Sequence, residues 1–498
     1  MVTFLQRTFT SLVHAHAGRT QGQSQSPASW LDSLTLACVG GVITLCHVGA
    51  VLSRCIFKDQ ILGQYDFGFQ QIEINNEDNG KSVEDIERII NTKNLNTLSN
   101  TELEIFKTYK HESTHLLDGT STLWGMEYTC RMYNWFNDPT ETYLKVISLN
   151  DAEIQMHSKL LQNPNTAQNF IKLKYSLEHD EQCGVYVHMH YLNEYDSVIQ
   201  STPITMLSLI EGHAYSQEQL ISCDLYEDDL VSSNLLVAQV NKDINSLSGS
   251  EYSCFLALIN QLFPELKLRQ KLLIMILISR FSLNAPTFFI GSFPEYILSH
   301  IFSGAPQELI SALKMEMSRG MHRSTLCLAL LLCLAMHSET TKRITNSTTF
   351  DEMEEVLLKV YQSKNQSVED VKSSLLLQYK LEFELLSELL NEKGAYLAKK
   401  LADQFKDKNW YFDDLNTLEL PDFFLSNGDK AEPSKRIDYD MEAHMNDKLE
   451  KVVNLESALK GLGVARQHLY PHVYHDWLNR IKSGETGTVY YPEASNGL

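Results

Sequence analysis

The chain has 498 residues, of which 43% are hydrophobic, and it carries a formal net charge of −21 at pH 7. A chain of this length can bury more than one hydrophobic core. So acidic a protein repels phosphate backbones, which excludes nucleic acid as an expected partner. The sequence contains no glycine-rich phosphate loop and no G-x-S-x-G elbow, so nucleotide-dependent chemistry and serine hydrolysis have no support.

Residues 1–60 form an N-terminal extension whose composition differs from the rest. Leu34 to Leu52 is an uncharged run of 19 residues with three glycines, which is long enough to span a bilayer once. The run predicts a membrane anchor at 34–52, and the alternative is a helix buried against the rest of the protein. Nine cysteines without any C-x-x-C spacing are typical of a reducing compartment. The expected location is therefore either cytoplasmic or membrane-anchored through this span.

The next predicted elements are a strand and two helices. Tyr65 to Ile74 has the aromatic and β-branched composition of a strand. Thr101 to Glu104 reads as a capping box, with a hydroxyl at the N-cap and a carboxylate at N3. Gly119 is a plausible residue to end that helix, which gives it about 16 residues. Thr120 to Thr122 then cap a second helix.

The first of these helices carries the most informative motif, His111-Glu112-Ser113-Thr114-His115, which reads H-E-x-x-H. Two histidines four residues apart share one face of a helix and can bind one metal ion. The glutamate between them lies beside that ion, where it can take a proton from a water molecule. A catalytic zinc needs three protein ligands and one open position, so the motif lacks one ligand.

A later helix offers the third ligand. Thr202 and Pro203 are suited to the N-cap and first position of a helix. Apolar and acidic residues then share one stripe, namely Ile204, Leu207, Glu211, Ala214, Glu218 and Ile221. A carboxylate on a buried face is costly unless it is paired or binds a metal. We therefore take Glu211 as the third ligand and expect Glu218 to orient a ligand histidine.

Other polar residues leave alternatives open. Gly184 to Tyr191 alternates like a strand, and His188 and His190 share one face of it. That pair could replace Glu211 as the third ligand or stabilise an oxyanion, or it could face water. His213 and Tyr215, which flank Glu211, are further oxyanion candidates. Asp118 could hydrogen-bond a ligand histidine or face solvent.

The motif and the later glutamate together resemble the zincin superfamily of metallopeptidases, in its glutamate-ligand branch, the gluzincins. The metzincin extension fails, because Asp118 and Ser121 stand where it needs glycine and histidine. The resemblance implies that His111, His115 and Glu211 bind Zn²⁺, that Glu112 is the general base, and that a small sheet packs on the active-site helix. Two departures are the long spacing between His115 and Glu211 and the presence of Tyr215 where the family has an aspartate.

These observations predict a predominantly helical α+β protein. Its zincin-like metallopeptidase domain spans residues 61–260, and a helical domain spans 261–498, with Leu272–Ile278 and Leu326–Met336 as buried core helices. The expected function is a hydrolase that cleaves peptide bonds in a peptide or protein substrate with zinc. One alternative is a zincin-derived binding or regulatory module that holds metal without cleaving. Another is an interaction protein in which the motif is accidental.

Overall fold

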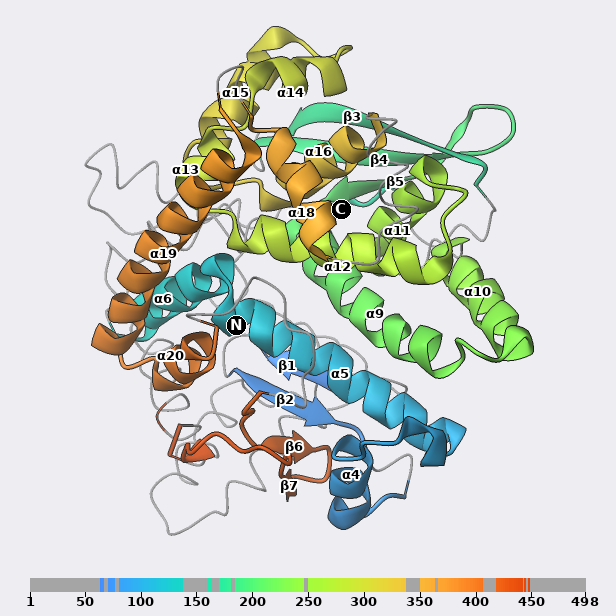
Figure 1. Cartoon of the computed structure of the whole chain (residues 1–498), viewed down its shortest axis with the longest axis vertical. Coiled ribbons are helices and arrows are strands. Elements are labelled where there is room, and N and C mark those ends of the chain that lie inside the picture. The colour runs from blue at the N-terminus through green and yellow to red at the C-terminus, as the bar shows by residue number, and fades with distance from the viewer. Residues whose placement is uncertain are drawn as a thin grey trace, which may run out of the picture. The chain divides into compact units, whose positions relative to one another are not determined.

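The structure of the chain is a computed structural model (Figure 1). It describes residues 63–66, 70–76, 80–137, 157, 160–162, 170–180, 184–245, 250–336, 350–362, 366–405, 418–441, 443–444 and 447. Two compact units make up the chain. The first contains Met1–Glu112, Asn416–Tyr470 and Gly487–Leu498, and the second contains Ser113–Leu415 and Pro471–Thr486. These units divide the chain at other places than the predicted domains, 61–260 and 261–498.

The first unit is built around a small mixed sheet in the order β1-β2-β6-β7. Its strands are β1 (Gly63–Asp66), β2 (Gln71–Ile74), β6 (Phe423–Leu425) and β7 (Lys430–Ala431). The predicted strand from Tyr65 to Ile74 is thus a hairpin of two short antiparallel strands. Strand β2 pairs in parallel with β6, a partner that comes from the far end of the chain.

Helical elements complete this unit. They are α4 (Val83–Ile90), the 3₁₀ helix η1 (Leu95–Thr97) and the first half of α5 (Asn100–Ser121). The sheet packs on α5: a Cβ at Gly63 would lie 2.6 Å from Cγ2 of Thr108. The rings of Tyr109 and Phe423 lie 5.1 Å apart, centroid to centroid. Glycine at position 63 therefore lets β1 approach the helix closely.

Helix α5 begins earlier and ends later than the sequence predicted. Its cap is Ser99 and not Thr101, since the backbone N–H of Ser99 donates to Glu102 at 3.0 Å and the N–H of Glu102 donates to the Ser99 hydroxyl at 3.4 Å. The helix has 22 residues and continues through Gly119. Thr122 then caps α6 (Leu123–Asn137), its hydroxyl accepting from the N–H of Gly125 at 3.0 Å. The prediction of a second helix after a hydroxyl cap is confirmed.

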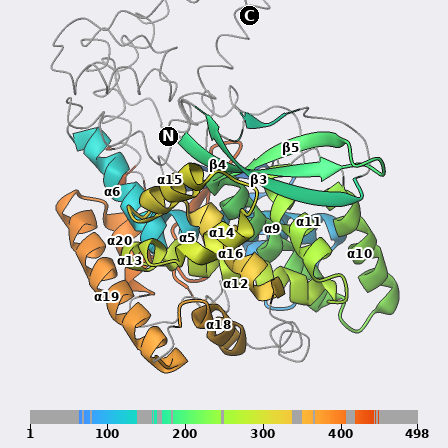
Figure 2. The same ribbon diagram turned by 90° about the horizontal axis from the view of Figure 1, so that it is seen from above.

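The second unit contains an antiparallel sheet and most of the helices. The strands are β3 (Lys172–Asp180), β4 (Gly184–Leu192) and β5 (Val198–Ile204), in that order. The helices are α6, α9 (Met206–Leu225), α10 (Leu230–Asn245), α11 (Ser250–Leu262), α12 (Leu268–Asn284), α13 (Thr287–Gly291), α14 (Glu295–Ile301), α15 (Gln307–Met317), α16 (Arg323–Met336), α18 (Phe350–Lys359), α19 (Val368–Glu392) and α20 (Tyr396–Asp403). Figure 2 shows the sheet on one side of α9 and α11.

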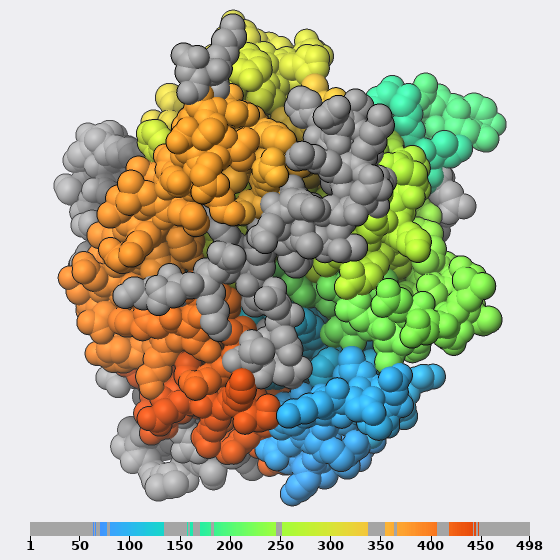
Figure 3. Space-filling view, in the orientation of Figure 1, coloured from blue at the N-terminus to red at the C-terminus, as the bar shows by residue number. Residues whose placement is uncertain are grey.

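The core of this unit surrounds α12 and α16. Every residue from Leu272 to Ile278 is buried, and so is every residue from Leu326 to Leu334. The two apolar runs are therefore core helices, as predicted. Helix α19, coloured orange in Figure 3, lies at the surface, where Leu377, Leu381 and Leu385 are exposed.

The predominantly helical α+β class is confirmed for the described residues. Among them, no helix is both long and apolar enough to cross a membrane. The run from Leu34 to Leu52 lies outside the described residues, so the predicted anchor stays a prediction. Strands β6 and β7 lie within residues 261–498, which were expected to form a helical domain, and they contradict that expectation.

Candidate metal centre

Helix α5 positions the two histidines of the H-E-x-x-H motif. His111 and His115 are one helical turn apart on the same face, and both are buried. Glu112 follows His111 directly and is also buried. The helix is continuous where the chain passes from the first unit to the second, between Glu112 and Ser113. The relative positions of the three motif side chains therefore depend on one rigid element.

Helix α9 supplies the third member of the group. It starts at Thr205, whose hydroxyl accepts from the N–H of Ser208 in a capping box. The predicted start at Thr202 and Pro203 is wrong, because both residues lie in β5, where Pro203 pairs opposite His188. Strand β5 is an edge strand, a position that tolerates proline. The N-cap is instead the hydroxyl of Thr205, three residues after Thr202.

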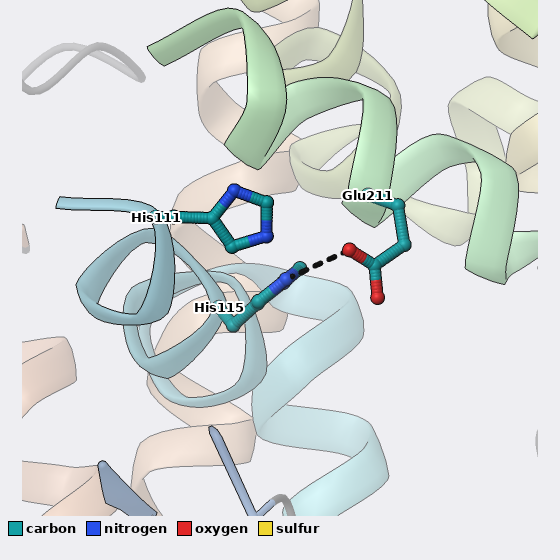
Figure 4. A group of neighbouring side chains, drawn as sticks. All are labelled: His111, His115 and Glu211. Atoms are coloured by element: carbon teal, nitrogen blue, oxygen red, sulfur yellow. Dashed lines mark hydrogen bonds and ion pairs between the residues drawn. The ribbon is translucent and has the colours of Figure 1, made fainter. Parts of the chain in front are cut away.

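Glu211 reaches the motif from α9. Its Oε2 lies 3.1 Å from Nε2 of His115, across 96 residues of sequence. One ligand atom from each of His111, His115 and Glu211 lies within 4.8 Å of the others. Figure 4 shows the two rings on α5 with the carboxylate of α9 beside them. The structure thus brings together the three residues that the sequence selected.

Two imidazoles and one carboxylate form a donor set that suits zinc. Tetrahedral zinc with bonds of about 2.0–2.1 Å places its ligand atoms roughly 3.4 Å apart. The 3.1 Å separation of His115 and Glu211 and the 4.8 Å limit for the group bracket this value. Small rotations of the side chains can therefore bring all three donors onto one ion, so the residues fit a zinc site.

His188 and His190, the alternative third ligands, belong to a different cluster. The Nδ1 of His188 lies 2.9 Å from Oε2 of Glu178, and its Nε2 lies 3.0 Å from the carbonyl oxygen of Leu160. The ring of His190 lies between the hydroxyls of Ser176 and Ser201, at 2.7 and 2.8 Å. The structure does not bring either histidine into the group of His111, His115 and Glu211.

Asp118 bonds differently from the prediction. It is fully buried, and its Oδ2 accepts from Nδ1 of His213 at 2.7 Å while its Oδ1 accepts from the Arg280 guanidinium at 3.0 Å. Burial alone would raise the pKa of Asp118, but the His213 ring and the Arg280 charge outweigh it and hold that pKa below its ordinary value. Asp118 therefore contacts His213, two residues after the candidate ligand Glu211, and does not face solvent.

The two other candidates on α9 have partners of their own. The hydroxyl of Tyr215 donates to Asp243 at 3.1 Å, and burial together with that carboxylate raises the pKa of Tyr215. Glu218 accepts a hydrogen bond from Gln219 at 2.9 Å. A role for Glu218 in orienting a ligand histidine stays a prediction. The stripe of α9 that was predicted to be buried is incompletely so. Ala214 is buried, whereas four of its residues are half-buried, namely Leu207, Glu211, Glu218 and Ile221.

Sequence reasoning missed two residues near this group. His157 is buried against the first turn of α9, with Nδ1 3.3 Å from the hydroxyls of both Thr205 and Ser208. No periodicity or motif singles out this histidine. Arg280 could have been found from the sequence, because it is the one charged residue between Leu272 and Asn284 in a long apolar run. A buried charge of this kind needs an opposite charge.

Comparison of the chain with protein-family models, with curated proteins and with solved structures yields no match.

Proposed function

We propose that the chain is a zinc-dependent metallopeptidase of the kind that the gluzincin resemblance implies. One observation carries the proposal: Glu211 meets His115 at 3.1 Å although 96 residues separate them. Glu211 supports the proposal because, together with both histidines of the motif, it forms a group of three possible ligand atoms within 4.8 Å of one another, and a catalytic zinc needs three protein ligands. His111, His115 and Glu211 would hold the zinc, and a peptide or protein would be the substrate.

Each side chain then has a distinct task. Zinc, when bound, supplies a Lewis acid that polarises a carbonyl and lowers the pKa of water. Glu112 is rigidly placed on the same helix as both histidines. Its carboxylate takes a proton from the attacking water and passes it to the departing amine. Its burial limits competition from bulk water for that proton.

Metal content of the purified full chain tests the centre. About one zinc per chain is expected, and His111→Ala should lose it, because two ligands hold zinc far less tightly than three. His190→Ala is the matched control, since it removes a histidine from the Glu178 cluster and should leave the zinc in place. A chain without zinc after reconstitution, or zinc retained by His111→Ala, would contradict the proposal.

Glu112→Gln tests the chemistry separately from the metal. The variant should keep its zinc and lose about 10²- to 10⁴-fold or more of its peptide cleavage rate, because the amide cannot accept the proton. Cleavage of a mixed peptide library by both proteins provides the measurement. An unmodified chain that binds zinc and cleaves none of these peptides would instead fit the metal-holding module.

A further inference from the structure

Three buried polar side chains join three helices next to the candidate ligands. Asp118 on α5 binds His213 on α9 at 2.7 Å and Arg280 on α12 at 3.0 Å. All three side chains are at most 1% exposed. The Arg280 guanidinium also lies over the ring of Phe405, 5.7 Å from its centroid. All four residues belong to the second unit.

The position of this network along the helices is its most informative property. Asp118 lies three residues after His115, which is about one turn of α5, and His213 lies two residues after Glu211 on α9. The bond between Asp118 and His213 is thus a second direct contact between α5 and α9, in addition to the approach of Glu211 to His115. Two such bonds between α5 and α9 fix the register of one helix against the other.

Helix α12 holds the same stretch of α9 from another side. A Cβ at Gly212 would lie 2.8 Å from the terminal carbon of Met275 on α12. Helix α12, which carries Arg280, therefore contacts α9 between Glu211 and His213. The residue pair Glu211 and His213 is consequently constrained by both α5 and α12.

Stability alone does not account for such a network. Replacing a buried ion pair by well-packed apolar residues is often neutral or even stabilising. Setting the relative arrangement of the elements that carry it is the best-attested use of such a network. The arrangement that this network selects is the one in which Glu211 meets His115.

We propose that Asp118, His213 and Arg280 are positioning residues that set the separation of His115 and Glu211 and thereby the affinity and coordination geometry of the metal centre. This inference rests on the proposed metal site. None of the three is a catalytic residue, since each acts through a ligand.

Two substitutions of His213 differ only in where they place an N–H donor. His213→Asn puts its amide nitrogen near the position of Nδ1 and can still donate to Asp118. His213→Gln puts its amide nitrogen near the position of Nε2 and cannot. The Gln variant should bind Zn²⁺ about 10- to 100-fold more weakly than the unmodified chain, and the Asn variant should bind it almost normally. Asp118→Asn should weaken binding like the Gln variant.

The measurements are the Zn²⁺ dissociation constant by competition with a chelator, the visible spectrum of the Co²⁺-loaded protein, and the melting temperature without metal. The Co²⁺ spectrum reports coordination geometry and should change in His213→Gln and Asp118→Asn. Arg323→Met is the control: Arg323 is a buried cation that donates to carbonyls at the end of α12. The Arg323→Met variant should melt at lower temperature than the unmodified chain, whereas its Zn²⁺ affinity and Co²⁺ spectrum should be unchanged.

The possible results separate the two proposals. Equal Zn²⁺ affinity in His213→Asn, His213→Gln and the unmodified chain would overturn the positioning role, even if both variants melt at lower temperature. If His213→Gln does not fold, equal Zn²⁺ affinity and Co²⁺ spectra in Asp118→Asn and the unmodified chain would overturn it as well. Failure of the unmodified chain to bind Zn²⁺ would overturn the metal centre itself, and the positioning role with it.

Discussion

His213 on α9 and His157 beside the first turn of α9 are both buried, but their surroundings differ. His213 faces the carboxylate of Asp118, whereas Nδ1 of His157 faces the hydroxyls of Thr205 and Ser208. A carboxylate oxygen of Glu251 lies 3.8 Å from Nε2 of His157. Burial is the largest influence on the pKa of His157 and lowers it to about 4, and the charge of Glu211 only partly opposes that effect. His157 is therefore held as a neutral ring.

This environment predicts a pH dependence of stability. Unfolded histidine has a pKa near 6.5, so between pH 6.5 and pH 4 the unfolded chain binds a proton at His157 that the folded chain does not. The free energy of unfolding must then fall as the pH falls through this window. For this one residue the loss is about 2 kcal/mol between pH 7 and pH 5. Urea unfolding at both pH values should show that His157→Gln loses this much less stability than the unmodified chain.

A matched replacement completes this measurement. His300→Gln makes the same change on an exposed residue and accounts for the loss of one histidine from the composition. Parallel stability curves for the unmodified chain and His157→Gln over the whole range from pH 7 to pH 4 would contradict the assigned environment of His157.

At the scale of single elements, hydroxyl side chains determine where α5 and α9, the helices of the candidate metal centre, begin. Each helix has two hydroxyl side chains within a few residues that could serve as the cap. The sequence favoured Thr101 for α5 and Thr202 for α9, whereas the structure uses Ser99 and Thr205. The candidate residues have similar capping strength. Which of them caps the helix therefore depends on the secondary structure of the residues that precede it. Residues before Thr205 are already committed to β5.

Paired alanine substitutions test the start of α5. Ser99→Ala should lower the free energy of unfolding by about 1 kcal/mol, because the N–H of Glu102 loses its acceptor. Thr101→Ala changes an exposed residue within the first turn and should alter stability by less than about 0.5 kcal/mol. Chemical denaturation of both variants gives the comparison. If Thr101→Ala lowered the free energy of unfolding as much as Ser99→Ala or more, Thr101 and not Ser99 would be the N-cap.

For the whole molecule, local patterns predicted what depends on neighbouring residues and missed what depends on distant ones. The motif helix, the apolar core helices and the strand of His188 follow from short periodicities. The proximity of Glu211 to the motif could also be expected from the sequence, because a carboxylate in an apolar stripe is costly without a partner. The pairing of β2 with β6 and of Asp118 with Arg280 joins segments far apart in the sequence. No periodicity within either segment encodes its partner.

The final prediction concerns β6 and β7, the two C-terminal strands of the first unit. Strand β6 covers the edge of β2, and the buried ring of Phe423 lies 5.1 Å from that of Tyr109, two residues before His111 on α5. A chain that ends at residue 415 would expose the edge of β2 and leave this part of α5 without its packing partner. We expect it to aggregate or to melt at clearly lower temperature than a control chain that ends at Asp447, which keeps β6 and β7. Light scattering and thermal melting of the two chains measure the difference. Equal melting temperatures with both chains monomeric would mean that β6 and β7 contribute nothing to the support of α5.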